Sequence, residues 1–349
     1  MKKKNKTFII AEIGPNHNGS IKIAKKMIRK LSSIDIDAIK FQLGDPNEVY
    51  SDDAFKAPYQ KKNDKENSVK AMSKKNQLSK SEHIAISKFC NKLGIPYACT
   101  AFDLKSLKFL NKNFKLPFFK IPSGEVTSLD LINYISKQKK PIILSTGMSD
   151  FQEIKKVKSM LEKHHKNKIT ILHCVSEYPA KIKNVNLNII DELKRRFKCD
   201  IGYSDHTNEE ETCISAVAKG ATIIEKHVTL DRNAGGPDDS FSLESGELKS
   251  LCDSTKIAWS SVGRVDYGKK SSEIGNIQFR RSLYVAENLS SGDVITEHNV
   301  KSIRPGYGLA PKYMTEIVGK KINKNMVAGD SLQSEDIEGF LIKDPNVQD

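Results

Sequence analysis

The 349-residue chain has no apolar run long enough to cross a membrane. Its first apolar stretch, Phe8–Glu12, reaches a carboxylate too early for a secretory signal peptide. The 6 cysteines form no Cys-x-x-Cys pair, and several lie in apolar runs, which is typical of reduced thiols that pack as small hydrophobic residues. These absences predict a soluble, cytoplasmic protein without a membrane partner.

Arginine is scarce, and no nucleic-acid-binding motif is recognisable, although the formal net charge is +14 and the isoelectric point is about 9.3. The excess charge is mostly lysine, spread over predicted helix surfaces such as residues 22–26 and 155–158. Lysines in that arrangement are typical of solvated helix faces, which can also steer anionic substrates. We therefore expect no nucleic-acid partner.

No Gly-x-Gly-x-x-Gly follows any predicted strand, which argues against a dinucleotide-binding sheet. Instead, short apolar runs bounded by Gly or polar residues alternate with helical patterns, as buried parallel strands do. Eight such runs predict an α/β fold, a (β/α)8 TIM barrel over residues 1–264, with a doubly wound open sheet as the alternative. The runs span residues 7–13, 37–42, 95–101, 116–121, 141–146, 169–175, 200–206 and 221–227.

A polar insertion separates the second strand from its following helix. Residues 43–78 are too rich in Lys, Asn and Asp to form core, and loops of that length are commonly functional lids or partly disordered. The helix predicted at 81–93 follows, with Ser81 as its N-cap and Gly94 as its end.

Beyond Val262 the composition changes. Residues 265–279 are polar and contain glycine, which indicates a linker, and residues 280–349 read as a small, mostly β domain. Residues 287–300 align with residues 324–337 at one offset, with a Gly-Asp turn pair in each copy. The second domain is therefore predicted to consist of two related halves.

Two of the barrel strands end in histidine. The run 200–206 ends at His206, the run 221–227 ends at His227, and residues 209–219 between them read as a helix. Strand, helix and strand form a unit whose crossover places the two strands side by side and parallel. Two imidazoles at neighbouring strand ends predict a site for a borderline divalent ion such as Mn, Fe, Co or Zn, although a hydrogen-bonded structural role is the alternative for each.

Polar residues gather at the same end of nearly every predicted strand, where a TIM barrel has its pocket. Lys40 and Lys120 arise from apolar strands, where an unpaired ammonium group is costly, so they require an anion. Ser123, Ser145 and Ser204 follow strands near helix starts, where hydroxyl and backbone N–H groups suit a phosphate. The set predicts a small substrate that carries phosphate and carboxylate.

Glu12 and Glu125 are the candidate acid–base or hydroxyl-binding groups of this pocket. A metal at His206 and His227 can polarise a carbonyl group. Together, these residues predict the joining of an anionic three-carbon unit to a sugar-like carbonyl. The prediction requires that the two imidazoles and the two lysine ammonium groups, which are far apart in sequence, line one cavity.

At these residues the chain resembles the N-acetylneuraminate (sialic acid) synthase family, and the resemblance covers the barrel nearly end to end. The tail, with Arg281-Ser-Leu283 and Ile303-Arg-Pro-Gly306, resembles the antifreeze-protein-like SAF domain of that family. The resembling barrel segments are Ala11–Gly19, Lys40-Phe-Gln42, Lys120–Glu125, Ile143–Met148, Leu172–Cys174 with Tyr178-Pro179, Gly202–His206, Glu225-Lys-His227 and Gly236-Pro-Asp238.

The resemblance implies condensation of phosphoenolpyruvate with an N-acetylmannosamine-type sugar, which gives a nine-carbon 2-keto acid and phosphate. By similarity, His206 and His227 bind Mn²⁺ or another divalent ion such as Mg²⁺ or Co²⁺. The resemblance also implies that Lys40, Thr100 and Lys120 bind the phosphoenolpyruvate carboxylate.

For the phosphate, the resemblance implies Lys120, Ser123, Ser145 and Ser204. Ser176 departs from the pattern, since some members carry a phosphate-binding Asn there, and its hydroxyl can still donate a hydrogen bond. The residues implied to face the sugar are Glu12, Gln42, Glu125, Tyr178 and Asp238.

Arg304 resembles an arginine that the tail domain inserts into a partner's barrel, so the resemblance implies a domain-swapped homodimer. The segment Lys56–Gln60 is similar to bacterial synthases of sialic and legionaminic acids, and the intact Glu12-Ile13-Gly14 argues against the pseudaminic acid branch. A pseudaminic acid synthase, a synthase acting on a 6-phosphorylated sugar, a Schiff-base aldolase using Lys40 or Lys120 and a sugar-binding or assembly protein remain the alternatives.

Overall fold

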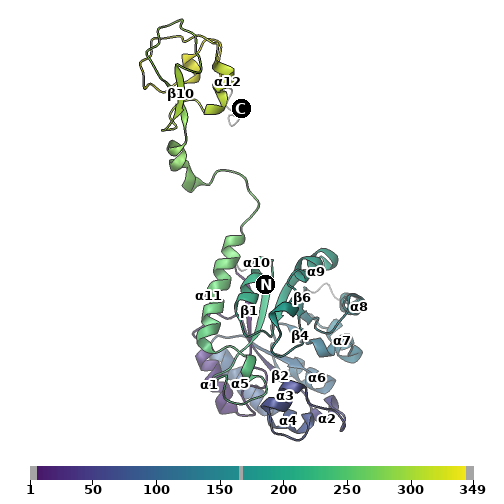
Figure 1. The fold of residues 1–349 in the computed structure, drawn as a ribbon. Coiled ribbons are helices and arrows are strands. Elements are labelled where there is room, and N and C mark those ends of the chain that lie inside the picture. Colours follow the sequence, from purple (N-terminus) through teal and green to yellow (C-terminus); the bar gives the residue numbers. More distant parts are fainter. Residues whose placement is uncertain (1–5, 165–167, 343–349) are drawn as a thin grey trace. The chain divides into compact units, whose positions relative to one another are not determined.

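The computed structural model describes residues 6–164 and 168–342 (Figure 1). The chain divides into two compact units, residues 1–263 and residues 264–349, and each is described by itself. No helix in the described ranges combines the length and the apolar character that crossing a membrane requires.

The first unit is a barrel of eight parallel strands. Strand β1 pairs with β2 on one side and with β8 on the other, and β3 and β4 are in contact where the ends of the sheet meet. The predicted TIM-barrel fold is therefore confirmed. The strands are β1 (Phe8–Glu12), β2 (Ala38–Leu43), β3 (Tyr97–Ala101), β4 (Phe119–Ile121), β5 (Ile142–Ser145), β6 (Ile169–Cys174), β7 (Asp200–Asp205) and β8 (Ile223–His227).

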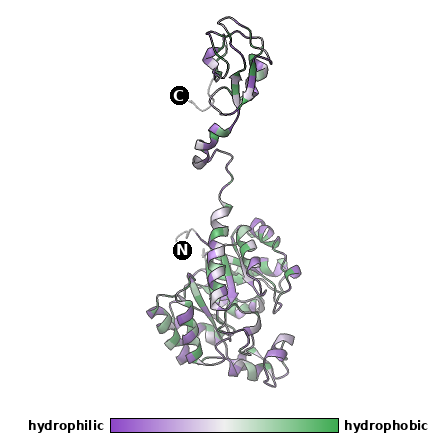
Figure 2. Cartoon of the chain, turned by 60° about the vertical axis from the view of Figure 1, so that its left-hand side comes forward, coloured by the Kyte–Doolittle hydropathy of each residue, from purple (hydrophilic) through white to green (hydrophobic). Residues whose placement is uncertain are grey.

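Helices surround the strands and carry hydrophobic and hydrophilic residues together, as amphipathic helices do (Figures 1 and 2). The N-cap of helix α5 lies two residues earlier than predicted, because Ser79 and not Ser81 caps the helix and forms a capping box with Glu82. The barrel helices are α1 (Ile21–Leu31), α5 (Lys80–Lys92), α6 (Leu104–Asn113), α7 (Leu129–Ser136), α8 (Phe151–Glu162), α9 (Ile189–Phe197), α10 (Glu211–Ala218) and α11 (Ser245–Val262).

The insertion at 43–78 is not an irregular loop. It folds into α2 (Pro46–Val49), α3 (Pro58–Asn63) and α4 (Val69–Lys75), and it buries Val69 and Met72. A buried ion pair between Lys56 Nζ and Asp64 Oδ1, 2.7 Å apart, joins the residues that flank α3. The prediction that this segment is too polar to contribute to the core was wrong, because caps and local ion pairs satisfy much of its polarity.

The second unit has two regular strands in the part of the chain that the structure describes. Strands β9 (Ser282–Val285) and β10 (Val300–Ile303) form an antiparallel pair, and isolated bridges, the short helix α12 (Met314–Ile317) and 3-10 turns complete it. Its small apolar core includes Leu283, Ile295 and Leu332.

The two predicted halves of this unit are related by reciprocal hydrogen bonds. Asn288 Oδ1 accepts from the backbone N–H of Ala328 at 2.9 Å, and its counterpart Asn325 Oδ1 accepts from that of Ser291 at 2.8 Å. Leu289 and its own counterpart Met326 form a bridge between the copies. The sequence repeat is thus a structural repeat, with each copy capping the turn of the other.

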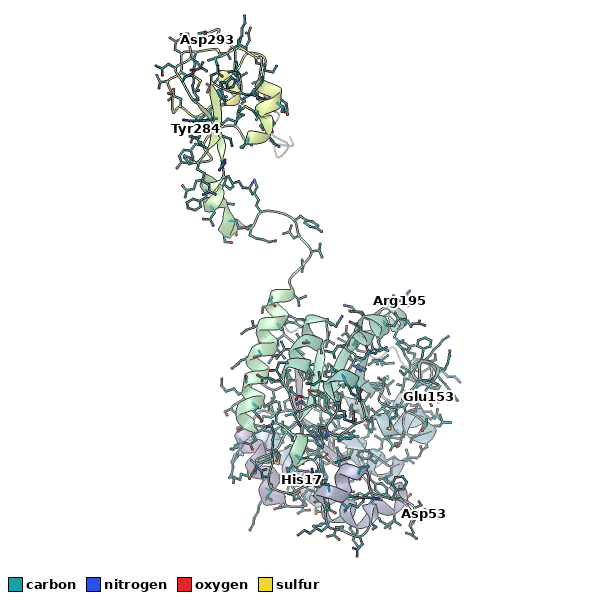
Figure 3. The ribbon with its side chains drawn as sticks, in the orientation of Figure 1. His17, Asp53, Glu153, Arg195, Tyr284 and Asp293 are labelled. Atoms are coloured by element: carbon teal, nitrogen blue, oxygen red, sulfur yellow. The ribbon has the colours of Figure 1, made fainter. Side chains whose placement is uncertain are left out.

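An aromatic cluster on one flank of the barrel buries two imidazoles. The ring of Phe41 lies between His17 and His83, with centroid distances of 6.0 Å and 6.1 Å, and Figure 3 labels His17 among the barrel side chains. His83 Nδ1 lies 2.8 Å from the hydroxyl oxygen of Tyr97. Burial lowers the pKa of each imidazole to about 4.

Because these rings bind protons near pH 6.5 when unfolded but only near pH 4 when folded, barrel stability is expected to fall as the pH drops through that window. Each ring is expected to lower the free energy of unfolding by about 2 kcal/mol at pH 5. The measurement is the free energy of barrel unfolding for the wild type and His83→Gln at pH 7 and pH 5, with the exposed His164→Gln as control. The variant should lose less stability on acidification, and equal losses in all three proteins would contradict the prediction.

Candidate active site

One cavity of about 820 Å³ lies at the carboxyl ends of the barrel strands. It brings together the two imidazoles and the two ammonium groups that the sequence predicts to converge. The predicted residues that line it are Glu12, Lys40, Gln42, Thr100, Lys120, Ser123, Ser145, Ser176, Tyr178, Ser204, His206, His227 and Asp238.

Two predicted residues lie outside this lining. Glu125 follows Gly124, which does line the cavity, and its half-buried carboxylate accepts a hydrogen bond from Ser128 Oγ. Burial raises the pKa of Glu125. Arg304 belongs to the second unit, where it directly follows β10 and is exposed.

Strand periodicity explains why the polar residues meet. An apolar layer fills the barrel interior with Ile10, Ala38, Ala98, Phe118, Ile143, Leu172 and Ile223. Side chains on a strand return to the same face every second residue. The residues two positions further along these runs are therefore also inward, and they form a polar layer: Glu12, Lys40, Thr100, Lys120, Ser145, Cys174 and Glu225.

Lys40 is held by a carboxylate and a hydroxyl group of its neighbours. Its Nζ lies 2.7 Å from Glu12 Oε2 and donates to Thr100 Oγ1 at 3.0 Å. Although burial opposes the charge, Glu12 and Glu225 outweigh it and raise the pKa of Lys40. Gln42 Nε2 donates to the other oxygen of Glu12 at 2.8 Å.

Lys120 pairs with Glu225, a residue that the sequence analysis did not assign to the site. Lys120 Nζ lies 2.9 Å from Glu225 Oε1, and Ser204 Oγ donates to the same oxygen at 3.4 Å. Burial lowers the pKa of Lys120, whereas Lys120 and Lys40 overcome burial and lower the pKa of Glu225 to about 2. The signal for Glu225 was its position two residues before His227, on the same face of β8.

The serines form a compact group of hydroxyls beside Lys120. Ser123 Oγ accepts from the backbone N–H of Gly147 at 2.9 Å. A Cβ at Gly147 would lie 2.2 Å from Ser176 Oγ, so a larger residue there would displace that hydroxyl. Ser145 Oγ is buried and has no hydrogen-bond partner in the described part of the chain. A buried hydroxyl without a partner is unfavourable, which favours a polar ligand at this point.

The two imidazoles face each other, with ring centroids 5.6 Å apart. His206 Nδ1 lies 2.8 Å from the carbonyl oxygen of Val175, so it donates there and leaves Nε2 as a lone-pair donor. His227 Nδ1 is buried without a hydrogen-bond partner among the described residues, at 3.5 Å from Asp238 Oδ2. Burial, His206 and Lys40 lower the pKa of His227, which keeps it neutral as a ligand must be.

These donors fit a divalent ion whose remaining ligands come from substrate or solvent. In residues 6–164 and 168–342, no three His, Cys, Asp or Glu side chains are grouped as a complete ligand set. Catalytic metal sites keep positions open for substrate, so two imidazoles are compatible with such a site.

An aromatic wall completes the cavity, and part of it comes from the insertion. Tyr59 of α3 lies 5.0 Å from Tyr178 between ring centroids, and Tyr178 lies 4.2 Å from His206. Asn63 Nδ2 anchors α3 by donating to Pro237 O at 3.0 Å, next to Asp238. Sequence reasoning missed Tyr59 because the insertion has no strand periodicity to place it.

The mouth of this TIM barrel combines lysine–glutamate pairs, serine hydroxyls and two imidazoles. These groups define a class: a barrel enzyme that acts on anionic substrates. Comparison with known proteins makes the assignment specific. The chain belongs to the NeuB family, which matches residues 27–267, and the SAF domain matches residues 280–338. It is a phosphoenolpyruvate-dependent, C–C bond-forming enzyme of the sialic acid synthase type.

For three similar proteins, the matched region spans most of this chain and most of the other protein. The N,N'-diacetyllegionaminic acid synthase of Campylobacter jejuni is 40% identical over 92% of this chain and 97% of its own. That of Legionella pneumophila is 36% identical over 95% of this chain and 94% of its own. The solved N-acetylneuraminic acid synthetase of Leptospira borgpetersenii has a TM-score of 0.72 and 31% identity, and it covers 80% of this chain and 95% of that one.

Proposed function

We propose that this enzyme condenses phosphoenolpyruvate with an N-acetylated amino sugar to give a nine-carbon 2-keto acid and phosphate. The observation that carries the proposal is the convergence of Lys40, Lys120, His206 and His227 on one cavity. The sugar is proposed to be of the diacetamido, legionaminic type, because two similar proteins at 40% and 36% identity are N,N'-diacetyllegionaminic acid synthases. An N-acetylmannosamine substrate is the next candidate.

Lys40 and Lys120 bind phosphoenolpyruvate. Lys40, Thr100 and Lys120 bind its carboxylate, and Lys120 together with the serine hydroxyls binds its phosphate. Both ammonium groups already have a carboxylate partner, Lys40 with Glu12 and Lys120 with Glu225. The substrate anions therefore bind to ammonium groups that also contact a glutamate. The phosphate-binding hydroxyls are those of Ser123, Ser145, Ser176 and Ser204.

His206 and His227 would hold a divalent ion, Mn²⁺ or another ion such as Mg²⁺ or Co²⁺, which would supply Lewis-acid polarisation of the open-chain aldehyde of the sugar. C3 of phosphoenolpyruvate bonds to the aldehyde carbon, water adds at C2, and the C2–O bond to phosphate breaks. Glu12, which lines the cavity, exchanges protons or holds hydroxyls. Gln42, Tyr178 and Asp238 orient the sugar beside the aromatic wall.

The test is a phosphate-release assay with phosphoenolpyruvate and a panel of 2-acetamido, 2,4-diacetamido and 6-phosphorylated sugars, with and without Mn²⁺. Release that depends on both metal and a 2,4-diacetamido sugar of the legionaminic type supports the proposal. Release with only pseudaminic-type or 6-phosphorylated sugars would replace the sugar assignment, and sugar binding without release would favour a binding protein.

A Schiff-base aldolase is a second candidate, because burial lowers the pKa of Lys120 as a nucleophilic amine requires. Borohydride trapping with pyruvate, insensitive to EDTA, would favour that mechanism. The ion pair between Lys120 and Glu225 argues against it, since it stabilises the ammonium form.

We also propose a domain-swapped homodimer in which Arg304 acts in the barrel of the second copy. Arg304→Ala is expected to lose turnover while the dimer persists. Mixing it with His227→Ala at equal amounts should restore about a quarter of wild-type activity, because half of the dimers are mixed and each has one complete site. The measurement is phosphate release together with the mass of the assembly, and no recovery in confirmed mixed dimers would exclude action in trans.

A further inference from the structure

We infer that Asp205 and Lys226, which lie outside the cavity, are positioning residues that set the separation of the His206 and His227 imidazoles. This inference rests on the proposed metal site. It concerns residues that touch neither substrate nor metal and that act through the backbone of the two strands.

The pair joins the two strands that carry the imidazoles. Asp205 and Lys226 are register partners on β7 and β8. Because side chains alternate along a strand, Ser204 and His206 face the cavity and Asp205 faces away, and likewise Lys226 faces away between Glu225 and His227. Both outward side chains are 0% exposed, and Lys226 Nζ lies 2.5 Å from Asp205 Oδ2.

The carboxylate also holds the segment that follows His206. Asp205 Oδ1 accepts from the backbone N–H of Thr207 at 2.9 Å and from the hydroxyl of Tyr203 at 2.8 Å. Thr212 Oγ1, at the start of α10, donates to Oδ2 at 3.0 Å. The residues before and after His206 are therefore anchored to one buried carboxylate.

Lys226 binds the same segment from the neighbouring strand. Its Nζ donates to the carbonyl oxygen of Thr207 at 2.6 Å as well as to Asp205. One ammonium group, on the residue before His227, thus binds the side chain of the residue before His206 and the backbone of the residue after it. A shift of one strand end against the other would break these bonds.

Stability alone does not account for such a pair, because burying two charges costs roughly as much as their attraction returns. A rigid spacing of metal ligands does account for it, since groups that orient metal-binding histidines commonly change metal affinity about 10- to 100-fold when they are replaced. Asp205 and Lys226 act on both ligands at once through the backbone, because they precede His206 and His227 in the chain.

The test is the double variant Asp205→Asn/Lys226→Met, which removes both charges and leaves neither unpaired. Its dissociation constant for Mn²⁺, measured by electron paramagnetic resonance of free Mn²⁺, should rise about 10- to 100-fold. The matched control is Lys56→Met/Asp64→Asn, which removes a buried pair of the same chemistry from the insertion and should leave Mn²⁺ affinity unchanged. Should the double variant not fold, Tyr203→Phe removes one donor to Asp205 and should raise the same constant severalfold.

A crystal structure of the variant separates this inference from the proposed function. Imidazole centroids displaced from their 5.6 Å separation support positioning, whether or not Mn²⁺ binds. Unchanged imidazoles together with unchanged Mn²⁺ affinity would overturn it. A wild-type protein that binds no Mn²⁺ would instead overturn the metal assignment, and the ring positions in the variant would still decide the role of the pair.

Discussion

His227→Ala is expected to reduce metal-dependent turnover by about three orders of magnitude or more, and His206→Ala should do the same. The loss follows because polarising the carbonyl through a metal contributes several kcal/mol to the transition state, and each 1.36 kcal/mol is a factor of ten. The fold should persist, because the imidazole of His227 is buried with an unpartnered Nδ1 in the described part of the chain, so its removal relieves a polar burial cost.

The measurement is phosphate release across a range of Mn²⁺ concentrations, with circular dichroism as the check on folding. His83→Gln is the matched control, since it removes another buried imidazole of the barrel that lies outside the cavity lining. The control should keep its turnover at pH 7.5. Full activity in either alanine variant would contradict the assignment of these histidines as metal ligands.

Lys120→Met has the second largest expected effect, a fall of about 30- to 5,000-fold in kcat/KM for phosphoenolpyruvate. Removing one partner of a buried, hydrogen-bonded charge pair commonly costs about 2–5 kcal/mol, which corresponds to that range. The variant loses the cation proposed to bind phosphate and carboxylate, and it leaves Glu225 without its 2.9 Å partner. The sugar KM should change far less.

Two further variants separate substrate binding from folding. The double variant Lys120→Met/Glu225→Gln also removes the Glu225 carboxylate, which lacks its ammonium partner in Lys120→Met. The double variant should therefore recover stability without recovering phosphoenolpyruvate binding. Lys56→Met removes a buried ammonium group that is paired with Asp64, and it should reduce stability while sparing KM for phosphoenolpyruvate. If the double variant regained normal kcat/KM, the role of Lys120 would be structural.

The barrel strands were readable from the sequence because each is a short buried run with a polar residue at its carboxyl end. Burial on both faces makes such runs continuously apolar, so a residue like Lys40 or Lys120 stands out. The repeat in the second unit was readable for a similar reason, because equivalent Asn and Gly-Asp positions make equivalent turn contacts.

The insertion was misread because its helices are short and rest on contacts with distant residues. Asn63 of α3 is anchored on Pro237, far along the chain, and Tyr59 packs on Tyr178. Helices of this length are marginal without tertiary contacts, so local pattern alone could not predict them. The site role of Glu225 was missed because its function depends on pairing with Lys120, a residue on a strand across the barrel.

By itself the sequence determined the barrel, the repeat of the second unit, and the polar groups that a parallel sheet gathers at one end. Strand periodicity and burial are local properties of the chain, so they can be read from neighbouring residues. Only the tertiary structure decided that Lys40 pairs with Glu12, that Lys120 pairs with Glu225, and that Asp205 and Lys226 lock the strand ends that carry His206 and His227. Those pairings depend on which strands lie side by side and which face each other across the barrel, and burial makes each unpaired charge costly enough to require them.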